Sequence, residues 1–126
     1  MIKRVYIAAR FGRREFIQAS VCSIVERAGF SVTSRWHRHP DDGELEGAMT
    51  CLQDMDSSDA VLLVTDPLGS KNSGGGRWFE AGYMFAMKKP IVVWGDREII
   101  FLHIPSIFVA NSLETAVRTL KSIQLK

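Results

Sequence analysis

Apolar residues follow two different patterns along this chain. Residues 5–9, 60–64 and 91–94 are short apolar runs that include β-branched side chains and contain no charged residue. Continuous apolarity of this length is typical of strands covered on both faces of a sheet. Residues 31–34 and 107–110 are weaker strand candidates. The sequence therefore predicts five strands.

Between these runs the apolar residues change to a helical period. Gly29 follows the first helical stripe and is suited to end that helix, because glycine adopts a left-handed backbone conformation at little cost. Asn111 and Glu114, at the start of the last stripe, have the spacing of a capping box. The stripes consist of Ile17, Val21, Ile24, Val25 and Ala28, then Leu45, Ala48, Met49, Leu52 and Met55, and finally Leu113, Ala116, Val117 and Leu120.

The alternation of strands and helices predicts the fold class. We expect an α/β protein with a single doubly wound (flavodoxin/Rossmann-like) five-stranded parallel sheet and helices on both faces, formed as one domain over residues 1–126. In such folds ligands bind beyond the carboxyl ends of the strands. A functional site is therefore expected in the loops that follow Ala9, Ser34, Thr65 and Trp94.

Composition narrows the classes of function. The 126 residues are 46% hydrophobic and 24% charged, which is typical of a globular domain and not of a disordered segment. A net charge of +2 argues against binding a nucleic acid polymer, and no apolar run has the length of a membrane span. Cys22 and Cys51 form no CxxC pair, and we identify no signal peptide. We therefore expect a cytoplasmic protein with reduced thiols.

The loop after the first strand is basic. Arg10, Gly12 and Arg13 lie there, followed by Arg14, directly before a predicted helix whose free N–H groups favour an anion. Three guanidinium groups at this position are suited to hold a phosphate. The alternative interpretation is a solvated helix start.

The loop after the second strand candidate contains aromatic and imidazole side chains. Trp36 is suited to stack on a nucleobase, with Arg35 or Arg38 adding positive charge. His37 and His39 have no acidic or thiol partner at ligand spacing, so we expect no metal site. Ordinary loop residues are the competing interpretation.

A glycine-rich segment after the third strand is the strongest local signal. Ser73, Gly75 and Gly76 precede a predicted helix that carries Glu80. Glycine allows close backbone approach to an anion or a sugar, and a helix start stabilises an ionised carboxylate. Glu80 is then suited to attack an anomeric carbon, unless it only caps its helix. After the fourth strand, Asp96 is a candidate contact to a ribose or a base.

Four segments match a known family. They are Tyr6-Ile7-Ala8-Ala9-Arg10, Ser58-Asp59-Ala60-Val61, Gly76-Arg77-Trp78-Phe79-Glu80-Ala81-Gly82-Tyr83 and Lys89-Pro90-Ile91. Through them the chain resembles the nucleoside 2-deoxyribosyltransferase-like proteins, which include deoxynucleoside 5′-monophosphate N-glycosidases. The resemblance implies that Glu80 attacks C1′ to form a glycosyl-enzyme ester and that Tyr6 orients it. It also implies that Ser73, Gly75, Arg10 and Arg13 hold the 5′ end of the substrate.

Cys51 departs from the pattern of this family. At that position, on the helix leading into the third strand, members usually carry an aspartate that contacts the sugar or assists departure of the base. A thiol is a weaker acceptor and acid than a carboxylate. Asp54 lies one turn further along the same predicted helix and is a candidate substitute, with a polar surface position as the alternative.

The expected function is cleavage of the N-glycosidic bond of a (deoxy)nucleoside or nucleoside 5′-monophosphate, by water or by an acceptor base, with no cofactor. The alternative is a catalytically degraded nucleotide-binding or sensor module, which Cys51 motivates. A receiver-like signalling domain is disfavoured because residues 8–10 supply no acidic side chain for Mg²⁺. The lysine-decarboxylase-like nucleotide hydrolases are a less similar family that cleaves the same kind of bond.

The resemblance also implies a homodimer in which a neighbouring subunit closes the pocket. The apolar side chains that suit such an interface, or alternatively the monomer core, are Trp78, Phe79, Tyr83, Met84 and Phe101.

Overall fold

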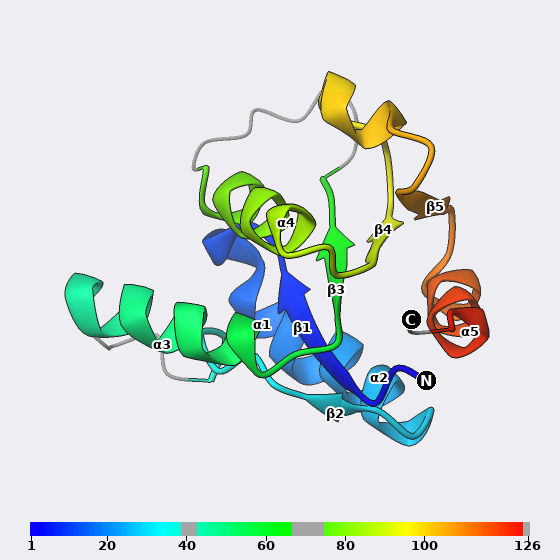
Figure 1. Cartoon of the computed structure of the whole chain (residues 1–126). Helices are drawn as coiled ribbons and strands as arrows, with labels where there is room; N and C mark the ends of the chain where they lie inside the picture. The colour runs from blue at the N-terminus through cyan, green and yellow to red at the C-terminus, as the bar shows by residue number, and fades with distance from the viewer. Residues whose placement is uncertain (39–42, 67–74, 125–126) are drawn as a thin grey trace.

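A parallel sheet organises the chain. The computed structural model describes residues 1–38, 43–66 and 75–124. Within these residues the sheet has five parallel strands in the order β2-β1-β3-β4-β5, with helices on both faces (Figure 1), which confirms the predicted fold class. The strands are β1 (Arg4–Ala8), β2 (Ser31–Val32), β3 (Ala60–Val64), β4 (Ile91–Trp94) and β5 (Phe108–Ala110).

The helical segments connect successive strands. The first connection is irregular, because a 3-10 turn and a π turn flank a short α-helical piece before a regular helix. The segments are η1 (Phe11–Arg13), α1 (Arg14–Phe16), η2 (Ile17–Val21), α2 (Cys22–Arg27), α3 (Glu44–Asp56), α4 (Gly76–Ala86), η3 (Ile100–His103) and α5 (Leu113–Ser122). Among the described residues, no helix combines the length and apolarity needed to cross a membrane.

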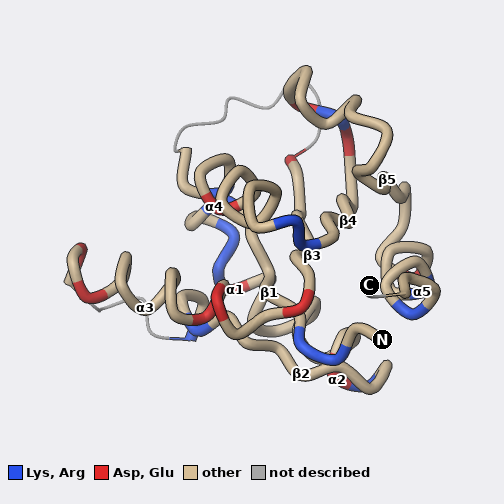
Figure 2. Tube along the Cα trace, in the orientation of Figure 1, with Lys and Arg blue, Asp and Glu red and all other residues tan. Residues whose placement is uncertain are grey.

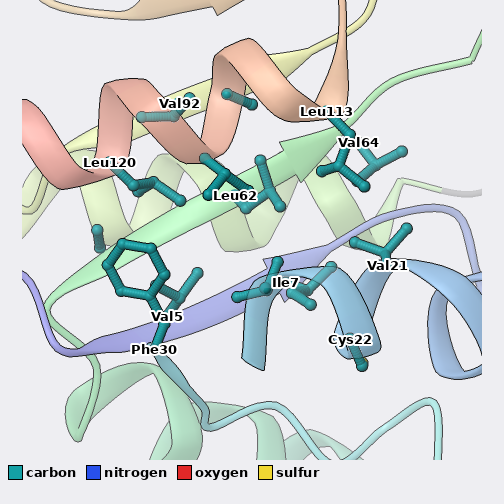
Figure 3. Packing of buried hydrophobic residues seen from close by; sticks show 14 of the residues in the cluster. Val5, Ile7, Val21, Cys22, Phe30, Leu62, Val64, Val92, Leu113 and Leu120 are labelled. Carbon is teal, nitrogen blue, oxygen red and sulfur yellow. The ribbon is translucent and has the colours of Figure 1, made fainter. Parts of the chain in front are cut away.

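Residues of each strand alternate between two apolar layers. On β1, Val5 and Ile7 face the layer formed with η2, α2 and α5, and Tyr6 faces the layer formed with α3 and α4. Figure 3 shows the first layer, in which side chains of α5 and α2 pack against β1 and β3. The alternation explains why the strands are apolar throughout, since both faces of the sheet are covered.

Two helix ends test the sequence-based assignments. The C-cap of α2 is Ala28, and Gly29, the next residue, has φ +103°, so the predicted glycine ends this helix one residue later than the C-cap itself. The capping box assigned to Asn111 and Glu114 is wrong. Ser112 is the extended residue before α5, and its hydroxyl accepts a hydrogen bond from the backbone N–H of Thr115 at 3.1 Å. Ser112 lies one residue closer to the helix and therefore reaches the free N–H groups.

Helix α3 is covered only at its carboxyl end. Lys89 holds that end, because its Nζ donates to the carbonyl oxygens of Met55 at 2.7 Å and Asp56 at 3.0 Å. The amino-terminal half of α3 extends away from the sheet (Figure 1), and Leu45 and Met49 are 76% and 51% exposed. The α3 and α4 layer is therefore open on one side.

Candidate active site

A cavity of about 630 Å³ lies beyond the carboxyl end of β1, the strand that neighbours β3 in the sheet. The strand order reverses between these two strands, and a doubly wound sheet binds ligands at that point. Loops after β1 and β2, the inner side of α3 and the start of α4 all contribute to it. It is lined by Ala9, Arg10, Phe11, Gly12, Trp36, Ala48, Cys51, Leu52, Met55, Gly76, Arg77, Phe79 and Glu80.

Tyr6 and Glu80 meet beside this cavity. Tyr6 points from β1 toward α4, is fully buried, and donates its hydroxyl hydrogen to Oε2 of Glu80. Burial and the neighbouring Glu80 carboxylate raise the pKa of Tyr6 above its ordinary range. The phenol therefore stays protonated at neutral pH and acts as a donor to the carboxylate.

The ionisation of Glu80 differs from the sequence-based expectation. A helix start was expected to hold Glu80 as an anion, but burial dominates and raises its pKa to about 7. Glu80 lies beyond the first turn of α4, where the helix dipole has weakened. Hydrogen bonds from Tyr6 and Cys51 lower the pKa and so offset part of the effect of burial. Glu80 consequently titrates near neutral pH.

Cys51 is the third member of this cluster. Its thiol lines the cavity from α3, within hydrogen-bonding reach of Tyr6 and Glu80. Burial is the main cause that raises the pKa of Cys51, and the nearby Glu80 carboxylate adds to it. A neutral thiol therefore stands beside Glu80 at neutral pH, at the position where the sequence motifs led us to expect a carboxyl group.

Aromatic rings form part of the cavity wall. The indole Nε1 of Trp36 donates to the carbonyl oxygen of Ile7 at 2.8 Å, which fixes the ring at the end of β1. The ring of Phe11 lies 6.4 Å from that of Trp36, and Phe79 lines the cavity from α4. His37 packs edge-on against Trp36 and is buried, with its ring nitrogens hydrogen-bonded outside the cavity. The wall therefore presents flat apolar surfaces to a ligand.

The three arginines of the first loop have different surroundings. Arg10 lines the cavity, and its Nε lies 3.0 Å from Oδ2 of the buried Asp66. Arg13 donates to the carbonyl oxygen of Thr65 at 3.1 Å and faces a smaller cavity of about 200 Å³. Arg14 lies over the ring of Phe11. Only Arg10 among the three thus lines the main cavity.

Other residues expected at the site lie elsewhere. Asp54 is buried against Arg35, with an Arg35 Nη2 to Asp54 Oδ1 distance of 2.8 Å, so it does not take the place of the family's aspartate in the cavity. Asp96 and Arg13 share the smaller cavity. Gly75 is exposed at the start of α4, and Ser73 lies outside the described residues.

Sequence reasoning missed several lining residues. Ala48, Leu52 and Met55 were assigned to a helical stripe of the core, yet they face the cavity as well. The sequence offered a signal for them, because Cys51, which the resemblance placed at the site, lies on the same predicted helix. Arg77 was read only as part of the family motif, but it is buried and lines the cavity.

Comparison with known proteins identifies the fold. No protein-family model and no curated protein matches the chain significantly. Solved structures do. A 2-desoxiribosyltransferase from Leishmania mexicana has a TM-score of 0.72 at 16% identity, over 95% of this chain and 98% of that one. The CMP N-glycosidase BcmB from Clostridium botulinum has a TM-score of 0.61 at 18% identity, over 94% and 98% of the two chains.

A receptor domain shares the same architecture. The TIR domain of the Toll-related receptor TRR-2 from Hydra magnipapillata has a TM-score of 0.63 at 16% identity, over 94% of this chain and 98% of that one. At these identities the likeness establishes the fold and nothing finer. The chain therefore has a nucleoside 2-deoxyribosyltransferase-like fold, as its motifs implied.

Proposed function

We propose that this protein is an enzyme that cleaves the N-glycosidic bond of a (deoxy)nucleoside or nucleoside 5′-monophosphate, with Glu80 as the nucleophile. The observation that carries the proposal is the hydrogen bond from Tyr6 to Glu80 beside a cavity with aromatic walls, at the switch point of the sheet. Two structural neighbours are named as a deoxyribosyltransferase and an N-glycosidase, which supports the same class of reaction.

The chemistry has two steps. In the first, a carboxylate oxygen of Glu80 attacks C1′ as the bond from C1′ to the base nitrogen breaks, and the base leaves with the bonding electrons and takes up a proton from solvent. In the second, water or an acceptor base attacks C1′ and loses a proton to solvent, the ester bond breaks, and the Glu80 carboxylate is restored. Tyr6 orients Glu80 throughout by its hydrogen bond.

The cavity suits a nucleoside. The rings of Trp36 and Phe11 offer surfaces on which a base stacks. Arg10 also lines the cavity and supplies a positive charge. Arg10 is paired with Asp66, so a substrate phosphate has to compete with that carboxylate. A nucleoside and its 5′-monophosphate are therefore both candidates.

The pH dependence of the reaction follows from Glu80. Only the ionised carboxylate attacks C1′, and the pKa of Glu80 is raised to about 7 by burial. The ratio kcat/KM should rise with pH up to that value and level off above it. A rate that is constant between pH 5.5 and 8.5 (about one and a half units on either side of that pKa) would contradict a role for Glu80 as the nucleophile.

A nucleotide sensor without activity is the second candidate. It is favoured by Cys51, which stands beside Glu80 in place of a carboxyl group. The fold is also compatible, since a receptor domain shares it. A sensor needs no ionisable group at the sugar, so its affinity for nucleotides should not depend on the charge of Glu80.

Turnover of a substrate panel separates the two candidates. Ribo- and deoxynucleosides and their 5′-monophosphates are incubated with the protein, with and without an acceptor base, and free or exchanged base is followed by chromatography. We expect turnover that Glu80→Gln reduces by about 10³-fold or more, because the covalent route is removed. Glu114→Gln, which alters an exposed carboxyl on α5, is the matched control and should leave the rate unchanged. No turnover, with nucleotide binding that survives Glu80→Gln, would establish the sensor.

A homodimer is the oligomeric state that we propose. Exposed apolar side chains continue outward from the cavity along α3 and α4, including Leu45, Met49 and Phe79. Met84, by contrast, is fully buried in the monomer and cannot serve in an interface. Sedimentation should show a dimer that Leu45→Lys converts to a monomer, whereas a monomeric wild-type protein would exclude this arrangement.

A further inference from the structure

Helix α4 begins without the usual local stabilisation. Gly75 is its N-cap residue and makes no side-chain capping hydrogen bond, and the first turn contains no acidic residue. A basic residue, Arg77, lies in that turn instead, where the helix dipole disfavours a positive charge. Contacts with other parts of the chain therefore have to hold the start of α4, which carries Glu80 one turn later.

Arg77 makes such contacts. It is only 3% exposed, and its Nη2 lies 3.2 Å from Oε2 of Glu98 and 3.9 Å from Oδ2 of Asp66. Its guanidinium carbon also lies 4.5 Å from the ring centroid of Trp78. A buried guanidinium needs close acidic partners to offset the loss of hydration, so these contacts fix where Arg77 and the first turn of α4 lie.

Glu98 connects the same turn to the sheet. Its side chain is 8% exposed, and while Oε2 faces Arg77, Oε1 accepts a hydrogen bond from the backbone N–H of Asp66 at the end of β3. Figure 2 shows an acidic position where β3 ends, and acidic and basic positions where the chain leaves β4. Glu98 thus ties three parts together: the end of β3, the segment after β4 and the start of α4.

The position of α4 determines the contact between Glu80 and Tyr6. Tyr6 belongs to β1 and is fixed in the sheet, whereas Glu80 moves with its helix. Residues three apart on a helix share a face, so a shift at Arg77 is passed on to Glu80. A displacement of about 1 Å at a reacting group is enough to reduce a rate by roughly 10²-fold.

We propose that Arg77 and Glu98 are a positioning pair, which holds the first turn of α4 against the end of β3 and thereby keeps Glu80 in contact with Tyr6. The pair does not touch the reacting atoms in this role. Its significance for catalysis rests on the proposed function of Glu80, but its effect on the environment of Glu80 can be measured without any substrate.

Three variants test the pair. Arg77→Met and Glu98→Gln each remove one charge, and the double variant removes both. Glu98→Gln is the milder change, because an amide oxygen still accepts the hydrogen bond from Asp66. We expect kcat to fall roughly 10- to 100-fold in each single variant with a smaller change in KM. The double variant should lose less than the product of the two single effects, because the residues act as a unit.

The titration of Glu80 is the readout that a merely structural role would not change. It is followed by carbon-13 NMR of the side-chain carboxyl group, which contacts Tyr6 from β1 and Cys51 from α3, while Arg10 and Arg77 line other parts of the same cavity. In the wild-type protein we expect a pKa of about 7. In Arg77→Met and Glu98→Gln, entry of water should move it down by about one unit or more, toward its ordinary value, because burial is the largest cause of the raised pKa and its loss outweighs the loss of the Tyr6 hydrogen bond.

Rescue and control variants complete the experiment. Arg77→Lys keeps the charge and should restore part of the rate and of the pKa. Arg118→Met breaks an exposed ion pair with Glu114 on α5, and it should change neither quantity. Folding of every variant is checked by circular dichroism.

The outcomes separate this proposal from the proposed function. An active wild-type protein whose rate and Glu80 pKa survive both Arg77→Met and Glu98→Gln would overturn the positioning pair alone. A wild-type protein without turnover, in which the Glu80 pKa still falls in these folded variants, would overturn the catalytic function and support the pair. If Arg77→Met does not fold, Glu98→Gln decides by the same two measurements.

Discussion

The two layers that cover the sheet are built from alternate residues of the same strands, yet they differ in kind. The layer with α2 and α5 contains apolar side chains such as Leu62, Val92 and Leu120, which are fully buried. The layer with α3 and α4 places a phenol, a thiol and a carboxyl group, those of Tyr6, Cys51 and Glu80, beside an open cavity. One layer therefore serves stability, and the other combines stability with a chemical site.

Neighbouring residues of one strand can belong to the two different layers. Val5 and Ile7 enter the closed layer, and Tyr6 between them enters the layer with the cavity, because strand side chains alternate. Burial in this layer raises the pKa of Glu80 to about 7, and that burial costs free energy. Substitutions in the two layers should therefore have separable effects.

The largest effect on stability is expected in the closed layer. Leu120→Ala in α5 leaves a void in fully buried packing and should lower the free energy of unfolding by about 3 kcal/mol. Urea denaturation measures this loss, and turnover per folded molecule should not change. A loss of turnover in the folded variant would show that the layers are not independent.

Tyr6→Phe tests the layer with α3 and α4, where we expect a loss of activity. It removes the hydrogen bond to Glu80 and should reduce kcat/KM by roughly 10- to 100-fold, since a hydrogen bond to a charged group contributes about 1.5–3 kcal/mol. The bond also lowers the pKa of Glu80, so the rising limb of the pH profile should move to higher pH. A limb that stays in place would contradict the contact.

Glu80 should also make stability depend on pH. Its pKa is about 7 in the folded chain and near its ordinary value of 4.5 when unfolded, so the folded state binds the proton more tightly. This contribution is complete below pH 4.5 and is lost as the pH rises through about 7. Denaturation of wild-type protein and Glu80→Gln across this range should show a steeper fall for the wild type. Parallel curves would show that Glu80 is not buried in solution.

Cys51→Asp should have the smallest effect and tests the departure from the family. A second carboxylate beside Glu80 disfavours its ionisation, so the rising limb of the pH profile should shift to higher pH by about one unit or less. Cys51→Asn serves as the uncharged control and should leave the limb in place. An equal shift in both variants would point to changed packing and not to charge.

Much of the fold was predictable from local patterns. The runs 60–64 and 91–94 coincide with β3 and β4, because strands buried on both faces leave an unmistakable apolar signal. Strand β2 is shorter than expected, since it lies at the edge and pairs only through Ser31 and Val32. The resemblance of short motifs to a known family predicted that Tyr6, Cys51 and Glu80 belong to one site.

The sequence by itself determined the strand and helix order, the parallel sheet and the residue types that gather at its carboxyl edge, because these depend on periodicity and on short motifs. Only the tertiary structure decided the raised pKa of Glu80, the pairing of Arg10 with Asp66 and the pairing of Asp54 with Arg35 outside the cavity. Ionisation depends on burial, and ion pairs depend on distances between segments far apart in the chain. Neither quantity is encoded in the local pattern around any one of these residues.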